Sequence, residues 1–334
     1  MSTAQLSVAR ARLPAELPGA RSRAVARVPV AIGAALLVLI LYASLAHGGV
    51  SLAVDTRLQL AITFLAMTGL VAWLWTGTLS LTAPRTALIG MGALSAFAAW
   101  SGLTVLWSVA PDQTWLELNR VITYILVLLL AIAIGASYAR ALELVGVGFL
   151  VVALAVTAYA LGQKLFPGLH VPGVFNLDQT GPLPRLQEPL GYWNALAVFI
   201  AMAVPAALAL AADATRSPRV RIAALCAVEP MLLTIIFTYS RGALLALAVA
   251  LGAGILLSAD RLRSAMWLGV VLVAMAPATG LGLASPHLTQ AGVKLSSREF
   301  AGAILAFIVL LSLVGLGFVG RRLIAVEPRV RISP

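Results

Sequence analysis

The sequence predicts an all-α membrane protein, a polytopic transmembrane helix bundle of about ten spans with both termini in the cytoplasm. Two features of composition predict this class: 61% of the 334 residues are hydrophobic and 10% are charged, whereas a soluble domain carries roughly 25% charged residues. The third is the recurrence of apolar runs of about 20 residues, the length at which a helix crosses a bilayer. We therefore expect a multi-pass protein of the inner (cytoplasmic) membrane.

The apolar runs give the expected spans and the ends of the membrane domain. Residues 1–27 are basic and contain Pro14 and Pro18, which predicts a disordered cytoplasmic tail before a transmembrane domain at 28–320 and a cytoplasmic tail at 321–334. The run after residue 27 is longer than the roughly 7–15 apolar residues of a signal peptide, so we expect an uncleaved first span. The spans are expected at about 28–46, 58–75, 87–106, 121–138, 141–161, 193–212, 222–239, 242–259, 265–284 and 300–319.

The distribution of Lys and Arg predicts the orientation, because cytoplasmic loops of membrane proteins retain positive charge. With the N-terminus inside, 7 of the 23 basic residues fall in outer segments, namely Arg57, Arg120, Lys164, Arg185, Arg241, Lys294 and Arg298. The cytoplasmic segments hold the other 16, which are Arg10, Arg12, Arg21, Arg23, Arg27, Arg85, Arg140, Arg216, Arg219, Arg221, Arg261, Arg263, Arg321, Arg322, Arg329 and Arg331. The opposite orientation would reverse this bias.

Charge and motif content limit the classes of function. The formal charge of +11 does not indicate nucleic acid, because the arginines form short clusters between apolar runs and not one basic face. We expect membrane lipids as their partner. Cys226 is the single cysteine, which excludes an internal disulfide and a metal site built on thiolates. The sequence has no H-E-x-x-H, G-x-S-x-G or G-x-x-x-x-G-K motif, so we expect neither a metal nor another cofactor.

Unusual polar residues gather in the segments expected outside the membrane. If the bundle brings them together, they form a charged chamber suited to an anionic ligand with sugar hydroxyls around it. The alternative is that each is an interfacial anchor or a snorkelling side chain. The segment 162–192 is rich in proline and glycine, so irregular backbone is expected there. The residues concerned are Asp112, Glu117, Asn119 and Arg120 after the third span, Asp178, Arg185 and Glu188 in the segment 162–192, and Arg241.

Single charged residues near or inside the spans have two possible roles each. Arg241 lies between two apolar runs with almost no loop, so it either anchors a turn at the membrane surface or points into the bundle as a functional charge. Glu229 precedes Pro230 inside an expected span, where it would serve a proton path or hydrogen-bond the backbone freed by the proline. The histidines lie at or beyond the outer face, where each is a potential general base or a solvated side chain: His47, His170 and His287.

Three segments stand in order at the expected outer face: LWSVAPD at 106–112, RL at 185–186 followed by GYWNAL at 191–196, and TYSRGALL at 238–245. In this order and spacing they resemble the O-antigen ligase and O-antigen polymerase family of bacterial membrane glycosyltransferases, and the resemblance covers roughly residues 58–319. It implies a metal-independent transferase that takes a glycan from an undecaprenyl-diphosphate carrier and joins it to an acceptor hydroxyl at the periplasmic face.

The resemblance also implies site residues. Arg185 and Arg241 stand where the family's diphosphate-binding arginines stand, which fits the bidentate grip of guanidinium groups on phosphate. Further candidates for the glycan site or the pocket lining are Asp112, Glu117, Arg120, Glu188, Tyr192, Asn194, Tyr239 and Ser240.

The chain departs from the family pattern on its C-terminal side. Members continue into a large periplasmic loop with a catalytic histidine and further spans, whereas this sequence stops soon after Arg321 and Arg322. None of the three histidines lies in a matching motif, so the catalytic residue is unknown and His287 is the nearest substitute. We therefore expect a chain that binds lipid-linked glycan without useful transfer on its own. It would be a truncated product, an inactive member, or a subunit completed by a separately encoded C-terminal half.

A secondary transporter or flippase-like carrier is the rival function, with Glu229 and the outer charges as a substrate path. It predicts inverted internal symmetry and helices broken near the midplane, whereas the ligase type predicts arginines in a pocket at one face. Glu229 is the single acid deep inside an expected span, which favours the ligase type.

Overall fold

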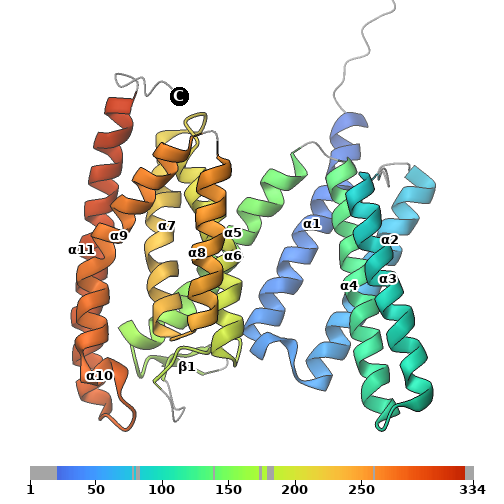
Figure 1. Ribbon diagram of the computed structural model, residues 1–334, viewed down its shortest axis with the longest axis horizontal. Coiled ribbons are helices and arrows are strands. Elements are labelled where there is room, and N and C mark those ends of the chain that lie inside the picture. Colours follow the sequence, from blue (N-terminus) through green and yellow to red (C-terminus); the bar gives the residue numbers. More distant parts are fainter. Residues whose placement is uncertain are drawn as a thin grey trace, which may run out of the picture. The chain divides into compact units, whose positions relative to one another are not determined.

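The computed structural model describes residues 21–76, 79, 83–137, 140–172, 175–178, 184–258 and 260–327, and these residues are almost entirely helical (Figure 1). The all-α fold class is confirmed. The long helices are α1 (Arg21–Leu45), α2 (Leu52–Thr76), α3 (Arg85–Thr104), α4 (Pro111–Ser137), α5 (Ala141–Leu165), α6 (Trp193–Ala212), α7 (Pro218–Phe237), α8 (Arg241–Leu257), α9 (Arg261–Ala284) and α11 (Leu295–Val326). The short elements are η1 (His47–Gly49), η2 (Val105–Trp107), α10 (Pro286–Thr289), β1 (His170–Val171) and β2 (Phe175–Asn176).

Within the described ranges, nine helices are long and apolar enough to cross a membrane, which supports a multi-pass membrane protein. Each of the expected spans coincides with a long helix. The remaining one, α8, has 17 residues and therefore spans about 26 Å, slightly less than the roughly 30 Å of the hydrocarbon core. Which side of the membrane holds the termini stays a prediction, and residues 1–20 and 328–334 of the two expected tails lie outside the described residues.

Several helices extend beyond their apolar runs. α4 begins at Pro111, well before the span expected from residue 121, so Asp112, Glu117 and Arg120 lie in its first turns. Proline suits the first helical position and an acid suits the first turn, because the helix N-terminus has unpaired N–H groups and a positive partial charge. α1 likewise begins at Arg21, inside the expected N-terminal tail, and α11 continues to Val326, inside the expected C-terminal tail.

Contacts along the chain divide it into two compact units. Unit 1 comprises residues 1–35 and 61–142, and unit 2 comprises residues 36–60 and 143–334. In unit 1, α3 and α4 pack together on either side of η2, with Trp100 and Trp107 in edge contact at 6.2 Å between ring centroids. The expected single transmembrane domain stays a prediction.

Unit 2 is built around α6 and α7, which pack against each other and against α8, α9 and α11 (Figure 1). On α6, Leu196, Ile200 and Val204 repeat every four residues and are fully buried, which places them on one stripe of the helix. α7 is buried on most of its surface, as expected of a central helix. The outer face of α11 instead exposes large apolar side chains such as Phe307 and Leu311, which suits contact with lipid.

Two glycines allow close approaches that shape one end of unit 2. A Cβ at Gly302 of α11 would lie 2.5 Å from the carbonyl oxygen of Lys164, at the end of α5, and a Cβ at Gly282 of α9 would lie 2.5 Å from the Phe237 ring, at the end of α7. Any side chain at either position would force the helices apart. We call this end the hairpin end, because β1 and β2 pair there as an antiparallel hairpin.

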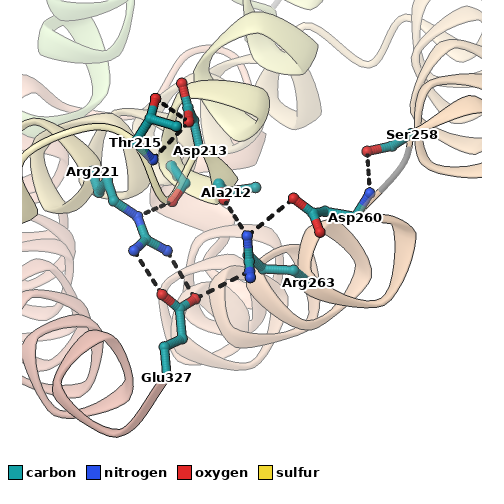
Figure 2. A network of polar contacts seen from close by, with 9 residues as sticks. Ala212, Asp213, Thr215, Arg221, Ser258, Asp260, Arg263 and Glu327 are labelled. Atoms are coloured by element: carbon teal, nitrogen blue, oxygen red, sulfur yellow. Dashed lines mark hydrogen bonds and ion pairs between the residues drawn. The ribbon is translucent and has the colours of Figure 1, made fainter. Parts of the chain in front are cut away.

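The opposite end of unit 2 is closed by a network of charged side chains (Figure 2). Arg221 is 3% exposed, and its Nη1 and Nη2 donate to the two carboxylate oxygens of Glu327 at 2.7 and 2.9 Å while its Nε donates to the Ala211 carbonyl at 2.9 Å. Arg263 Nε lies 3.4 Å from the same carboxylate. Buried charge is costly unless it is paired, so Glu327 holds the end of α11 onto α7 and α9.

Candidate functional site

The second and third sequence motifs meet at the hairpin end of unit 2, where α6 and α8 begin. The Ser240 hydroxyl donates to Asn194 Oδ1 at 2.7 Å, and Asn194 Nδ2 donates to the Tyr192 hydroxyl at 2.7 Å. Ser240 Oγ also accepts from the Ala243 backbone N–H at 3.3 Å, which caps α8. A continuous hydrogen-bonded chain therefore ties the start of α6 to the start of α8.

The loop that carries Arg185 is pinned on both sides of this residue. Lys164 Nζ donates to the Pro184 carbonyl at 2.7 Å, and the Leu186 N–H donates to the Phe237 carbonyl at 3.1 Å, with the Leu186 side chain fully buried. Between these anchors, the Arg185 guanidinium lies over the Trp193 ring at 5.4 Å from its centroid. Stacking of this kind holds the guanidinium plane in a fixed orientation.

Tyr239 lies beside Arg185 in a constrained backbone conformation. Its φ is 55°, in the left-handed region that a bulky residue adopts at a cost of order 1–3 kcal/mol. Burial raises the pKa of the Tyr239 phenol, and the Arg185 charge opposes part of this rise. The turn between α7 and α8 thus presents a neutral hydroxyl next to a cation.

Arg241 is the first residue of α8 and is exposed. Its cationic side chain stands at the positive end of the helix dipole, where an anion is favoured and a cation is not. Arg241 and the N-terminus of α8 therefore both bring positive charge to the turn that contains Tyr239, the residue beside Arg185. Direct reach of both guanidinium groups to one diphosphate stays a prediction.

His47 and Glu188 form a second pair at this end of the unit. His47 Nε2 lies 3.6 Å from Glu188 Oε2, and the His47 Cβ lies 3.6 Å from the place where a Cβ on Gly191 would be. His47 has a φ of 54° and stands in η1 with exposed imidazole. The connection between α1 and α2 therefore places a potential base beside the GYWNAL motif.

Other predicted site residues lie elsewhere. Asp112, Glu117 and Arg120 belong to unit 1, where Arg120 Nη1 donates to Glu117 Oε1 at 2.6 Å, and their place in the expected chamber stays a prediction. Asp178 pairs with Arg298 at 3.1 Å. His287 lies on α10 and lines a different cavity, with Lys164 and Arg298.

Glu229 has a packing partner on a neighbouring helix. It is fully buried in α7 and accepts a hydrogen bond from the Ser312 hydroxyl of α11, so the described partner is a side chain and not the backbone freed by Pro230. α7 nevertheless continues without a break from Pro218 to Phe237. The carrier function predicts a helix that is broken near this acid, whereas the described residues of α7 form one continuous helix.

The sequence names His47 as one of three potential bases but does not place it beside the GYWNAL motif. Two further residues that shape the site are not predicted from the sequence. Trp193 stands inside the GYWNAL motif, which is a signal for its role under Arg185. Lys164 comes from a segment far from the motifs, and its contacts depend on tertiary packing. Among the described residues, no group of three His, Cys, Asp or Glu side chains is placed to hold a metal ion.

No family model, curated protein or solved structure matches the chain. The family resemblance therefore continues to depend on the three sequence motifs.

Proposed function

We propose that this chain binds an undecaprenyl-diphosphate-linked glycan at the hairpin end of unit 2, as a membrane glycosyltransferase of the O-antigen ligase type. The observation that carries the proposal is the hydrogen bond between Ser240 and Asn194. It joins two motifs that the resemblance assigned to one site and that lie far apart in the sequence. A site of this kind at the periplasmic face of the inner membrane would meet a carrier lipid held in the same bilayer.

The arginines supply the binding of the diphosphate. Arg185, fixed over Trp193, offers a planar fork to phosphate oxygens, and Arg241 adds a second guanidinium at the N-terminus of α8. During transfer, the bond between the anomeric carbon and the phosphate oxygen breaks and negative charge grows on the diphosphate. Cations and N–H groups already in place lower the energy of that charge without reorganisation.

The neighbouring hydroxyl and amide groups suit a glycan. Tyr192, Asn194 and Tyr239 present polar groups around an aromatic surface, the combination that sugars use for hydrogen bonding and stacking. The acceptor hydroxyl needs a base as its oxygen attacks the anomeric carbon. We infer that His47 takes that proton, because the Glu188 carboxylate lies 3.6 Å from its imidazole and would stabilise the imidazolium that forms.

The test is direct binding of purified full-length protein to undecaprenyl-diphosphate glycan, with Arg185→Lys and Arg241→Lys. Each variant keeps the charge and loses the fork, so each should weaken binding about tenfold, the equivalent of about 1.4 kcal/mol. Arg219→Lys, at the opposite end of unit 2 and exposed, is the matched control and should bind like the wild type. Unchanged binding in both site variants would leave the arginines as interfacial anchors and remove the proposal.

A further inference from the structure

A small cavity lies at the hairpin end of unit 2, apart from the proposed carrier site. Its volume is about 50 Å³, enough for several water molecules or one compact polar group. The residues that give it its chemistry are Gln163, Lys164, Pro184, His287, Leu288 and Arg298. Neither Arg185 nor Arg241 lines it.

Lys164 brings a buried positive charge to this cavity. The residue is 5% exposed, and its Nζ donates to the carbonyls of Pro184 and Leu288, each at 2.7 Å. An ammonium has three N–H donors, so one makes no hydrogen bond to these carbonyls, and the Nζ also lies 5.9 Å from the centroid of the Phe237 ring. No described carboxylate lies within ion-pair distance of Lys164, and a buried charge without a counter-charge is costly.

Arg298 adds a second cation to the cavity. Its partner, Asp178, supplies one negative charge, so the net charge of Lys164, Arg298 and Asp178 is positive. Arg298 Nη1 lies 3.1 Å from Asp178 Oδ1, so this acid balances Arg298 and the charge of Lys164 remains. The guanidinium still has further N–H donors, and Arg298 borders the cavity. An anion in the cavity would complete the charge balance and accept hydrogen bonds from both cations.

Gln163 gives the cavity an acceptor as well. The residue is 2% exposed, and its Oε1 has no hydrogen-bond partner among the described residues. A buried amide oxygen without a partner is unfavourable, so a ligand hydroxyl that donates to it would be favoured. The lining of the cavity is therefore complementary to a ligand that carries both a negative charge and a hydroxyl.

We propose that this cavity binds a phosphate ester that carries a free hydroxyl, such as a glycerol phosphate group. The phosphate oxygens accept from Lys164 and Arg298, and the hydroxyl donates to Gln163 Oε1. The same chemistry is offered by the headgroup of phosphatidylglycerol and by soluble glycerol 3-phosphate. Lys164 lies one residue before the end of a helix that is long and apolar enough to span a membrane, so a lipid headgroup at that end of the helix would lie near the cavity.

The experiment uses the delipidated full-length protein and measures the shift of its thermal unfolding midpoint with added ligand. Phosphatidylglycerol should raise the midpoint, phosphatidylcholine should not, and phosphatidic acid, which has no alcohol hydroxyl, should bind about tenfold more weakly than phosphatidylglycerol at a pH where its phosphate is fully ionised. Soluble glycerol 3-phosphate separates the two sources: a response to this compound alone identifies a soluble ligand, and a response to the lipid identifies the headgroup. Either response supports the site, and no response to both would overturn it.

Variants connect the response to the cavity. Arg298→Gln should weaken binding of the responding ligand about tenfold, whereas Lys294→Gln, an exposed lysine that does not border the cavity, should bind like the wild type. Gln163→Leu should abolish the preference for phosphatidylglycerol over phosphatidic acid and leave phosphate binding in place. Arg185→Lys should not change phosphatidylglycerol binding. The carrier site and this cavity can therefore be tested independently, and one proposal can fail without the other. Equal binding by wild type and Arg298→Gln would rule the site out.

Discussion

The Ser240 hydroxyl donates a hydrogen bond to Asn194 Oδ1 and at the same time accepts one from the backbone N–H of Ala243. One side chain therefore both caps α8 and ties it to α6. Ser240 is 3% exposed, so water cannot readily replace either bond when the hydroxyl is removed.

We expect Ser240→Ala to lower the free energy of unfolding by about 1–2 kcal/mol, the usual cost of losing an N-cap. It should also weaken binding of the lipid-linked glycan, because Asn194 and Tyr192 lose their fixed positions. Ser258→Ala is the control: Ser258 Oγ accepts from the Asp260 N–H at the other end of α8. A loss of stability with unchanged glycan binding would show that this contact is purely structural.

The phenol of Tyr239 should ionise at a higher pH than an ordinary tyrosine, whose pKa is about 10, because burial raises its pKa. The folded chain then keeps the proton where the unfolded chain loses it. The stability that this gives is complete below about pH 10 and is lost as the pH rises through the folded pKa. The difference between spectrophotometric titrations of the wild type and Tyr239→Phe gives the pKa of Tyr239.

The charge of Arg185 provides a second test of the Tyr239 pKa. The Arg185 charge lowers the Tyr239 pKa, so Arg185→Gln should move the difference titration to still higher pH, while Arg219→Gln should leave it in place. A Tyr239 component that ionises with the other tyrosines would show that this side chain is solvated.

The helices could be predicted from the sequence because apolar runs of membrane length leave few alternatives. The run of α6 fixes that helix at residues 193–212, and Ser240 and Asn194 could be assigned to one site from the motifs. Hydrophobicity alone predicts a span from residue 121, whereas α4 begins at Pro111, where the proline and Asp112 are the signals of a helix N-terminus.

Long-range polar pairing could not be predicted. Arg221 was expected in a cytoplasmic loop, and nothing near it in the sequence indicates a bidentate pair with Glu327. Lys164 was one basic residue among several in the outer segments. Its contact with Pro184, which fixes the loop of Arg185, depends on how α5 and that loop pack.

We expect the Arg221 and Glu327 pair to be a main determinant of stability. Glu327→Ala leaves the guanidinium of Arg221 buried without a carboxylate, and breaking such a pair costs about 3–5 kcal/mol. Thermal unfolding in detergent should show a large fall in midpoint, with little change for the exposed control Glu299→Ala.

The double variant Arg221→Met with Glu327→Met separates the pair from the burial of a lone charge. Its stability should recover toward the wild type, because the uncompensated charge is gone. A double variant as unstable as the sum of the single variants would contradict direct coupling between the two residues.

Reporter fusions test the orientation that charge bias predicts. Fusions after Arg140, Arg219, Arg263 and Pro334 should report the cytoplasm, and fusions near Gly173 and Gln290 should report the periplasm. One reversed position would mean that a helix has been miscounted, with the short α8 the first to examine. Two reversed positions would defeat the topology of about ten spans.

The last prediction concerns the base. His47 lies 3.6 Å from Glu188 at the proposed carrier site, whereas His287 borders the separate cavity beside Lys164. A general base contributes about 10²–10⁴-fold to rate, so His47→Ala should lower any glycan transfer by this factor while carrier binding persists. Glu188→Gln should lower transfer less, because it removes only the stabilisation of the imidazolium. His287→Ala should transfer glycan like the wild type. Transfer that depends on His287 and not on His47 would place the chemistry at the other cavity.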